Sequence, residues 1–200
     1  GGLYLYDLES GSLTTLLNMA QDAGTASIRI SMLNGAAFAQ DNSQIVFFGS
    51  GSSIPAADGE EDFSIYGSIA VDGSGLKLTK PSDYEMEEMQ SSVSRLFFPQ
   101  AFTQADGTLL WVDRATGSAN TLSFSASGEG KDGVYGSEQG NYVATAVLGS
   151  NLTVRVYDVA SGELVATEVI ENSDSTYFSR IPRIYLLDGA KTAIVVLGGS

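Results

Sequence analysis

Two stretches, LYLYDLESGSLTTLL at residues 3–17 and LTVRVYDVASGELVATEVI at residues 152–170, share one pattern. In each, apolar and polar residues alternate, an Asp follows a Tyr, and a Gly stands four positions after the Asp. Alternation with a period of two is typical of a β-strand with one buried face. Asp accepts hydrogen bonds from a turn backbone and Gly adopts a positive φ angle, so each stretch predicts two strands joined by a tight turn.

Related hairpins occur at SIAVDGSGLKLT (68–79) and LLWVDRATGSANTLSF (109–124). The turn acids are Asp7, Asp72, Asp113 and Asp158, and the matching glycines are Gly11, Gly75, Gly117 and Gly162. A catalytic residue normally occurs once in an array of repeats, whereas a turn residue recurs in each repeat. We therefore expect these residues to be structural.

A second kind of hairpin has a polar turn followed by a strongly apolar strand. AAFAQDNSQIVFFGS (36–50) and QAFTQADGTLLWV (100–112) are its clearest examples. Its turns are Asp41-Asn42, Asp106-Gly107, Gln139-Gly140 and Asp188-Gly189. Asp-Gly between apolar runs is a strong hairpin signal.

Together the two hairpins form a repeat of four strands. The second turn recurs on average about every 49 residues, with gaps of 65, 33 and 49 residues. Four strands per 40–50 residues are typical of a β-propeller blade. The short gap makes TLLWV (108–112) serve both hairpins, so that blade lacks one strand or takes its fourth from residues 125–136. The sequence predicts an all-β propeller with three blades, one irregular, and a half-blade at each end.

Two insertions interrupt the repeats. Residues 50–63 have the composition of a loop. Residues 81–97 are predicted to form one short helix, because Ser82 and Glu85 have capping-box spacing. Met86, either Met89 or Gln90, Val93 and Phe97 also fall on one helical face. We expect that face, and the strand residues Tyr4, Tyr6, Tyr157 and Tyr185, to pack in the interior.

Composition narrows the classes of function. The chain has 10 Lys and Arg against 24 Asp and Glu, a net charge of −14, which disfavours a nucleic-acid partner. It contains no His and no Cys, which excludes imidazole and thiolate catalysis and His or Cys metal ligation within these residues. No G-x-S-x-G nucleophile elbow is present. A binding module is therefore favoured over an enzyme, with no cofactor expected and no membrane-spanning segment.

Acidic residues supply the candidate binding site. Those of the loop are Asp58, Glu60, Glu61 and Asp62, and those of the expected helix are Glu85, Glu87 and Glu88. Asp58, Glu60 and Asp62 could contribute oxygen ligands to Ca²⁺, although the loop lacks EF-hand spacing. The alternatives are a patch for a basic protein or peptide, and a solvated surface.

The alternation of hairpins resembles the WD40-like propeller repeats of TolB-type proteins. AAFAQDNSQIVFF matches the strand–turn–strand of one repeat half, and LYLYDLESGSLTTL matches the other. The Ser-Pro that usually precedes Asp-Gly is absent, and Trp111 is the sole Trp, so the resemblance is to a divergent member. Such propellers usually close with about six to eight blades, and about four are visible here.

The resemblance implies a non-catalytic binding or scaffold propeller over residues 1–200, in a bacterial periplasm or cell surface, with the cytoplasm as the alternative. Two other functions stay open: an accessory or catalytic propeller of a hydrolase, such as a peptidase or a glycosidase, and a structural part of a surface assembly. The half-blades either complete each other in a small ring or belong to a longer propeller, and the longer propeller is favoured.

Overall fold

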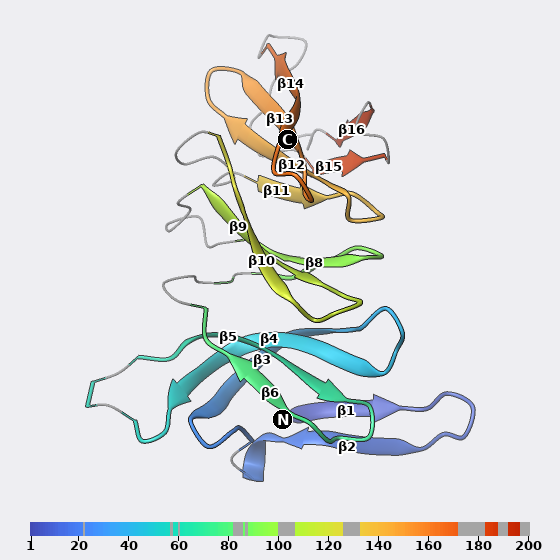
Figure 1. Ribbon diagram of the computed structural model, residues 1–200, viewed down its shortest axis with the longest axis vertical. Coiled ribbons are helices and arrows are strands. Elements are labelled where there is room, and N and C mark those ends of the chain that lie inside the picture. The colour runs from blue at the N-terminus through green and yellow to red at the C-terminus, as the bar shows by residue number, and fades with distance from the viewer. Residues whose placement is uncertain are drawn as a thin grey trace. The chain divides into compact units, whose positions relative to one another are not determined.

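The structure is a computed structural model. It describes residues 1–21, 23–56, 58–59, 61–81, 86, 88–99, 107–125, 133–171, 183–187 and 192–196. The chain divides into two compact units, Gly1–Glu88 and Met89–Ser200. Both are built from antiparallel strands that follow one another in chain order (Figure 1).

The first unit holds a hairpin and a four-stranded sheet. The hairpin joins β1 (Gly2–Tyr6) to β2 (Leu13–Asn18), and a short 3₁₀ helix, η1 (Met19–Gln21), follows it. The sheet has the order β3-β4-β5-β6. Its strands are β3 (Ile28–Phe38), β4 (Gln44–Ser53), β5 (Phe63–Ala70) and β6 (Lys77–Thr79).

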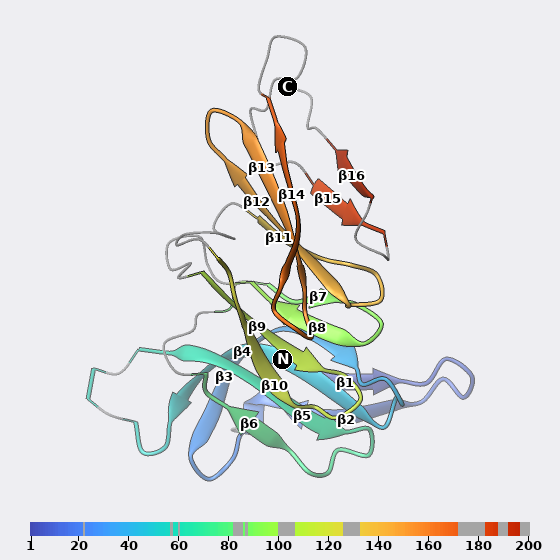
Figure 2. The same ribbon diagram turned by 45° about the horizontal axis from the view of Figure 1, so that its top comes forward.

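The second unit holds two four-stranded sheets and a hairpin. The first sheet consists of β7 (Gln90–Ser91), β8 (Arg95–Phe98), β9 (Thr108–Asp113) and β10 (Ala119–Ser123). The second consists of β11 (Gly133–Gly136), β12 (Tyr142–Leu148), β13 (Leu152–Asp158) and β14 (Leu164–Ile170). The hairpin joins β15 (Arg183–Leu186) to β16 (Ala193–Val196), which run side by side in Figure 2.

The architecture confirms the sequence prediction of propeller blades. Each four-stranded sheet is one blade with its strands in chain order, and the two terminal hairpins are half-blades. In every complete blade the first two strands form the inner hairpin, and the last two strands form the outer hairpin. By its Asp turn, β1–β2 is an outer hairpin, and β15–β16 has the polar turn of an inner hairpin.

The helix predicted over residues 81–97 is wrong where the structure describes that segment. Gln90–Ser91 and Arg95–Phe98 are strands β7 and β8, and Met86 forms an isolated bridge. Phe97 is fully buried, whereas Val93, predicted on the same helical face, is 46% exposed. The capping-box residues Ser82 and Glu85 lie outside the described residues.

The same strands explain the uneven repeat spacing. The inner turn of the second blade lies at residues 92–94, between β7 and β8, and Gly107 stands directly before β9, the third strand. Gly107 therefore does not lie in an inner turn, and Asp106 falls outside the described residues. With the turn at about residue 93, the inner turns near residues 41, 93 and 139 are almost evenly spaced. The missing strand of this blade is β7, not a segment of residues 125–136.

Apolar clusters lie between neighbouring sheets within each unit. In the first unit, Leu16 and Leu17 of β2 pack with Ile30, Phe47 and Ile65 of the β3–β6 blade. In the second unit, one cluster includes Phe97, Leu109, Val134, Val143 and Tyr157, from both complete blades. Another joins β12 and β13 to Ile184 and Leu186 of β15. Each sheet thus buries a face against the next sheet of its unit, as stacked blades do.

Candidate binding site

Three of the repeated turn acids hold identical turns. The Oδ1 atom of Asp158 accepts hydrogen bonds from the backbone N–H groups of Ala160 and Ser161, both at 2.9 Å, and from the Ser161 hydroxyl at 3.1 Å. The N–H of Gly162, at φ 76°, donates to the Asp158 carbonyl at 2.9 Å. Asp7 and Asp113 make the same set of bonds. In all three turns, the Asp Oδ1 atom therefore accepts hydrogen bonds from backbone N–H groups of the same turn.

Asp72 forms a second type of turn, and Asp41 forms a turn of the same type. The Oδ1 atom of Asp72 accepts from the Ser74 N–H at 2.9 Å and the Ser74 hydroxyl at 2.6 Å. Asp41 accepts from the N–H and hydroxyl of Ser43 at 3.0 and 2.8 Å. The sequence therefore grouped Asp72 with the wrong turn.

At four of these turns the hydrogen bonds favour the charged form of the carboxylate and lower its pKa. Donation from the Ser10 N–H and hydroxyl lowers the pKa of Asp7, and donation from the Ser43 N–H and hydroxyl lowers that of Asp41. The Ser74 hydroxyl and N–H lower the pKa of Asp72. The Ser161 N–H lowers that of Asp158 against an opposing effect of burial.

We expect Asp158→Asn to show what this charge contributes. Because the folded-state pKa lies below the ordinary 3.8, the charged turn stabilises the fold above that pH, and the contribution is lost as the pH falls through the folded-state value. Acid also relieves the repulsion of a chain with net charge −14, so the informative quantity is the difference in free energy of unfolding between wild type and variant. Denaturant titrations should give a constant difference from pH 7 to pH 5 that shrinks below about pH 4. A difference that grows on acidification would contradict the assignment.

The acidic loop lies between β4 and β5, where Asp58, Glu61 and Asp62 are all exposed. Glu88 is also exposed, and Glu60, Glu85 and Glu87 fall outside the described residues. Within the described parts of the chain, no three acidic side chains gather into a set that could hold a metal ion. The Ca²⁺ hypothesis for Asp58, Glu60 and Asp62 stays a prediction, since one of its residues is not described.

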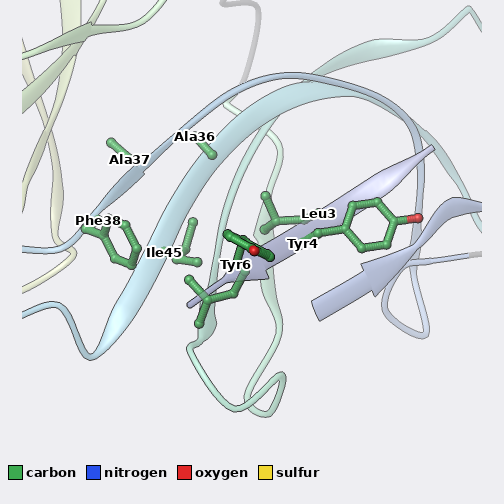
Figure 3. A pocket seen from close by; sticks show the side chains of 8 residues that line it. Leu3, Tyr4, Tyr6, Ala36, Ala37, Phe38 and Ile45 are labelled. Carbon is green, nitrogen blue, oxygen red and sulfur yellow. The ribbon is translucent and has the colours of Figure 1, made fainter. Parts of the chain in front are cut away.

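A groove of about 270 Å³ lies at the open edge of β1. Its lining residues are Leu3, Tyr4, Leu5, Tyr6, Ala36, Ala37, Phe38 and Ile45, from β1, β3 and β4. Within the described residues β1 pairs only with β2, so its other edge faces this groove. Figure 3 shows Tyr6 beside Ile45 and Tyr4 directed away from Phe38.

The expectation that the strand tyrosines are interior residues holds only for Tyr157, which is 1% exposed and shares a 2.8 Å hydrogen bond with the Ser125 hydroxyl. Tyr4 is 48% exposed, Tyr6 57% and Tyr185 51%. All three stand on the half-blades.

A second groove, of about 490 Å³, lies beside β16 in the other unit. It is lined by Val154, Val156, Val165, Ala166, Glu168, Ile170, Leu186, Thr192, Ala193 and Val195. Within the described residues β16 pairs only with β15. Each groove thus stands where a half-blade leaves a strand edge open against a complete blade.

Solved structures share this arrangement of blades. TolB from Acinetobacter baumannii matches over 96% of this chain and 42% of its own, with a TM-score of 0.50 and 17% identity. The chain has a divergent TolB-like β-propeller fold. A chain of the mitotic checkpoint complex matches over 96% of this chain and 50% of its own length, with a TM-score of 0.52 and 12% identity. The β-propeller domain of the Trilobed protease from Pyrococcus furiosus matches over 83% of this chain and 48% of its own length, with a TM-score of 0.52 and 9% identity.

The TolB-like propeller chain spans about half the length of the solved structures it matches. No family model matches it, and no curated protein matches it. No helix in the described residues is long and apolar enough to cross a membrane.

Proposed function

We propose that this chain is a non-catalytic propeller module that binds an extended segment of a protein partner at the groove beside β1. The open edge of β1 carries this proposal. An edge strand offers unpaired backbone donors and acceptors to an incoming strand, and neighbouring apolar side chains add affinity. Leu3 and Leu5 belong partly to the buried cluster of the unit, while Tyr4 and Tyr6 present exposed aromatic surface.

Tyr6 is the residue through which to test strand addition. Asp7 N–H donates to the Ser12 carbonyl at 2.9 Å, so in the alternation of an antiparallel ladder the Tyr6 N–H points away from β2, toward the open edge. Proline there removes the outward donor and leaves the bonds to β2 in place. Valine at the same position removes the aromatic ring and keeps the donor.

A displayed library of random peptides, selected on the purified chain, tests the proposal. We expect enrichment of segments with aliphatic residues at alternate positions, loss of their binding in Tyr6→Pro, and retention in Tyr6→Val. Alanine at Asp58, Glu60, Glu61 and Asp62 together forms the contrasting variant. Binding that depends on the acidic loop and ignores Tyr6→Pro would place the site on the loop and overturn the groove.

Two alternatives follow from the comparisons and the strands. The Trilobed protease relative supports an accessory propeller of a hydrolase, in which residues 1–200 serve a separate catalytic part. The open edges support a structural part of an assembly. The TolB likeness supports a bacterial periplasmic setting for the proposed module, which fractionation of the source cells would test.

A further inference from the structure

The outer strand of one complete blade differs from the outer strands of the other two. β14 has seven residues and exposes three large aliphatic side chains, Leu164 at 44%, Val165 at 46% and Val169 at 55%. β6 has three residues and β10 has five, and neither exposes a large aliphatic side chain. Short length, lysine and proline usually protect an edge strand from pairing. β6 begins with Lys77, whereas β14 contains neither lysine nor proline, so β14 is the least protected of the three outer edges.

The edge of β14 presents backbone hydrogen-bonding groups to a further strand. Within the described residues β14 pairs only with β13. Val159 N–H donates to the Asn141 carbonyl at 2.9 Å, so the odd-numbered residues of β13 bond to β12 and the even-numbered ones bond to β14. Beyond the irregularity near the turn, their partners on β14 are Ala166, Glu168 and Ile170. The N–H and C=O groups of Thr167 and Val169 therefore point away from β13, toward the open edge.

The charge around this edge favours a basic partner. Residues 152–171 contain four acidic residues, and Arg155 is their single basic residue. Two of the acids, Glu163 just before β14 and Glu168 within it, are exposed. A second copy of the chain is disfavoured at this edge, because it carries the same net charge of −14. Lysine or arginine on an incoming strand would instead lie beside carboxylates that solvent reaches.

The two faces of β14 determine which sequence fits. Side chains alternate along a strand, so Glu168 lies on one face, and Thr167 and Val169 lie on the other. Arg155 is opposite Thr167 and shares its face, which disfavours a basic residue there. An incoming strand continues both faces, with lysine or arginine beside Glu168 and an aliphatic residue beside Val169. The segment that fits therefore alternates basic and aliphatic residues.

We infer that the edge of β14 binds an extended, basic segment of a protein partner by strand addition. Backbone hydrogen bonds to Thr167 and Val169 supply affinity, and the alternating side chains supply specificity. The inference goes beyond the proposed function, because β14 belongs to the unit Met89–Ser200 and β1 to the unit Gly1–Glu88. It also gives the basic partner indicated by the composition a site other than the acidic loop.

A proline at Thr167 tests the backbone contact, because it removes the outward N–H and leaves the bonds to β13 in place. Thr121→Pro on β10 is the matched control. Asp113 N–H donates to the Ser118 carbonyl at 3.0 Å, so by the same alternation Thr121, opposite Leu110, also directs its N–H to an open outer edge. The two variants thus make the same change on outer strands of two blades, and only one of those strands has the aliphatic and acidic side chains.

The probe is a fluorescent peptide of about six residues, a usual strand length, in which valine and lysine alternate. Every protein in the test also carries Tyr6→Pro, so that binding at β1 does not contribute. Fluorescence anisotropy should show binding to this parent chain, binding about tenfold weaker with Thr167→Pro, and unchanged binding with Thr121→Pro. Glu168→Lys should reverse the preference, with loss of the valine–lysine peptide and gain of a valine–glutamate peptide of the same length.

Equal binding by the Thr167→Pro and Thr121→Pro proteins would mean attraction by net charge alone and would overturn the inference, as would a Glu168→Lys protein that still prefers the lysine peptide. Should Thr167→Pro fail to fold, hydrogen exchange on the parent chain decides: the peptide should slow exchange of the Thr167 and Val169 amides, and unchanged exchange overturns the inference. A dimer that Thr167→Pro dissociates in light scattering would make a second copy the occupant and also overturn it. Each of these failures leaves peptide binding at β1 standing.

Discussion

Phe97→Ala is expected to cost about 3–5 kcal/mol in free energy of unfolding, the range for truncating a buried aromatic residue. Phe97 lies on β8, is 0% exposed, and belongs to the cluster with Leu109, Val143 and Tyr157. Its ring also covers Gly136 of the next blade, where a Cβ atom would stand only 2.6 Å from it. Removing the ring opens a cavity between two sheets that rigid strands close poorly.

Val93→Ala is the control for that prediction. If residues 81–97 formed a helix, Val93 and Phe97 would lie on one face. Truncating either residue would then cost a similar free energy of unfolding per atom removed. In the structure Val93 is 46% exposed and lies in the turn before β8, so its truncation should change stability by less than about 0.5 kcal/mol. Denaturant unfolding of both variants measures the contrast. Comparable losses would favour the helix and contradict the strand.

The turns could be predicted from the sequence because their causes are local. The Gly162 N–H donates to the Asp158 carbonyl within one turn of five residues, and the positive φ at position 162 selects glycine. Four such signals with alternating flanks were enough to predict blades. The exception is Asp72, because Gly73 follows it directly and makes the turn shorter. The flanking strands alternate in the same way around both types of turn, so they do not reveal this difference.

Strand β7 could not be predicted, because distant residues determine it. Gln90 Nε2 donates to the Val134 carbonyl at 2.6 Å, and its Oε1 accepts from the Gly136 N–H at 3.1 Å. These bonds to β11 come from more than 40 residues away, and nothing within residues 81–97 signals them. Local spacing therefore favoured a helix, and tertiary hydrogen bonds prevailed.

The groove beside β1 was missed for a related reason. The period of two assigns Tyr4 and Tyr6 to one face of a strand and Leu3 and Leu5 to the other, as the structure shows. The period does not say whether a further sheet covers the tyrosine face. That depends on which strands neighbour β1, which is a property of the sheet and not of the strand.

Gly67→Val is expected to destabilise the first unit by at least the upper end of the range of about 1–3 kcal/mol for overpacking. Gly67 lies in β5, opposite Phe47 of β4 and Leu78 of β6. A Cβ atom there would stand 2.6 Å from Phe47 Cζ and 2.6 Å from the Lys77 carbonyl oxygen. Glycine in a strand ordinarily costs about 0.5–1 kcal/mol relative to alanine, so the clash outweighs the usual gain from replacing it.

A double-mutant cycle with Phe47→Leu separates the two contacts of Gly67. Shortening the ring relieves its clash with the new side chain and leaves the Lys77 carbonyl in place, so the double variant should recover part of the loss, with a coupling energy of about 0.5–3 kcal/mol. Gly149→Ala is the matched control, because its nearest atom would be 4.0 Å from the added Cβ, and its stability should stay close to wild type. Additive losses at positions 67 and 47 would mean that the backbone contact alone excludes a side chain. A neutral Gly67→Val would show that the Phe47 ring does not require glycine opposite it.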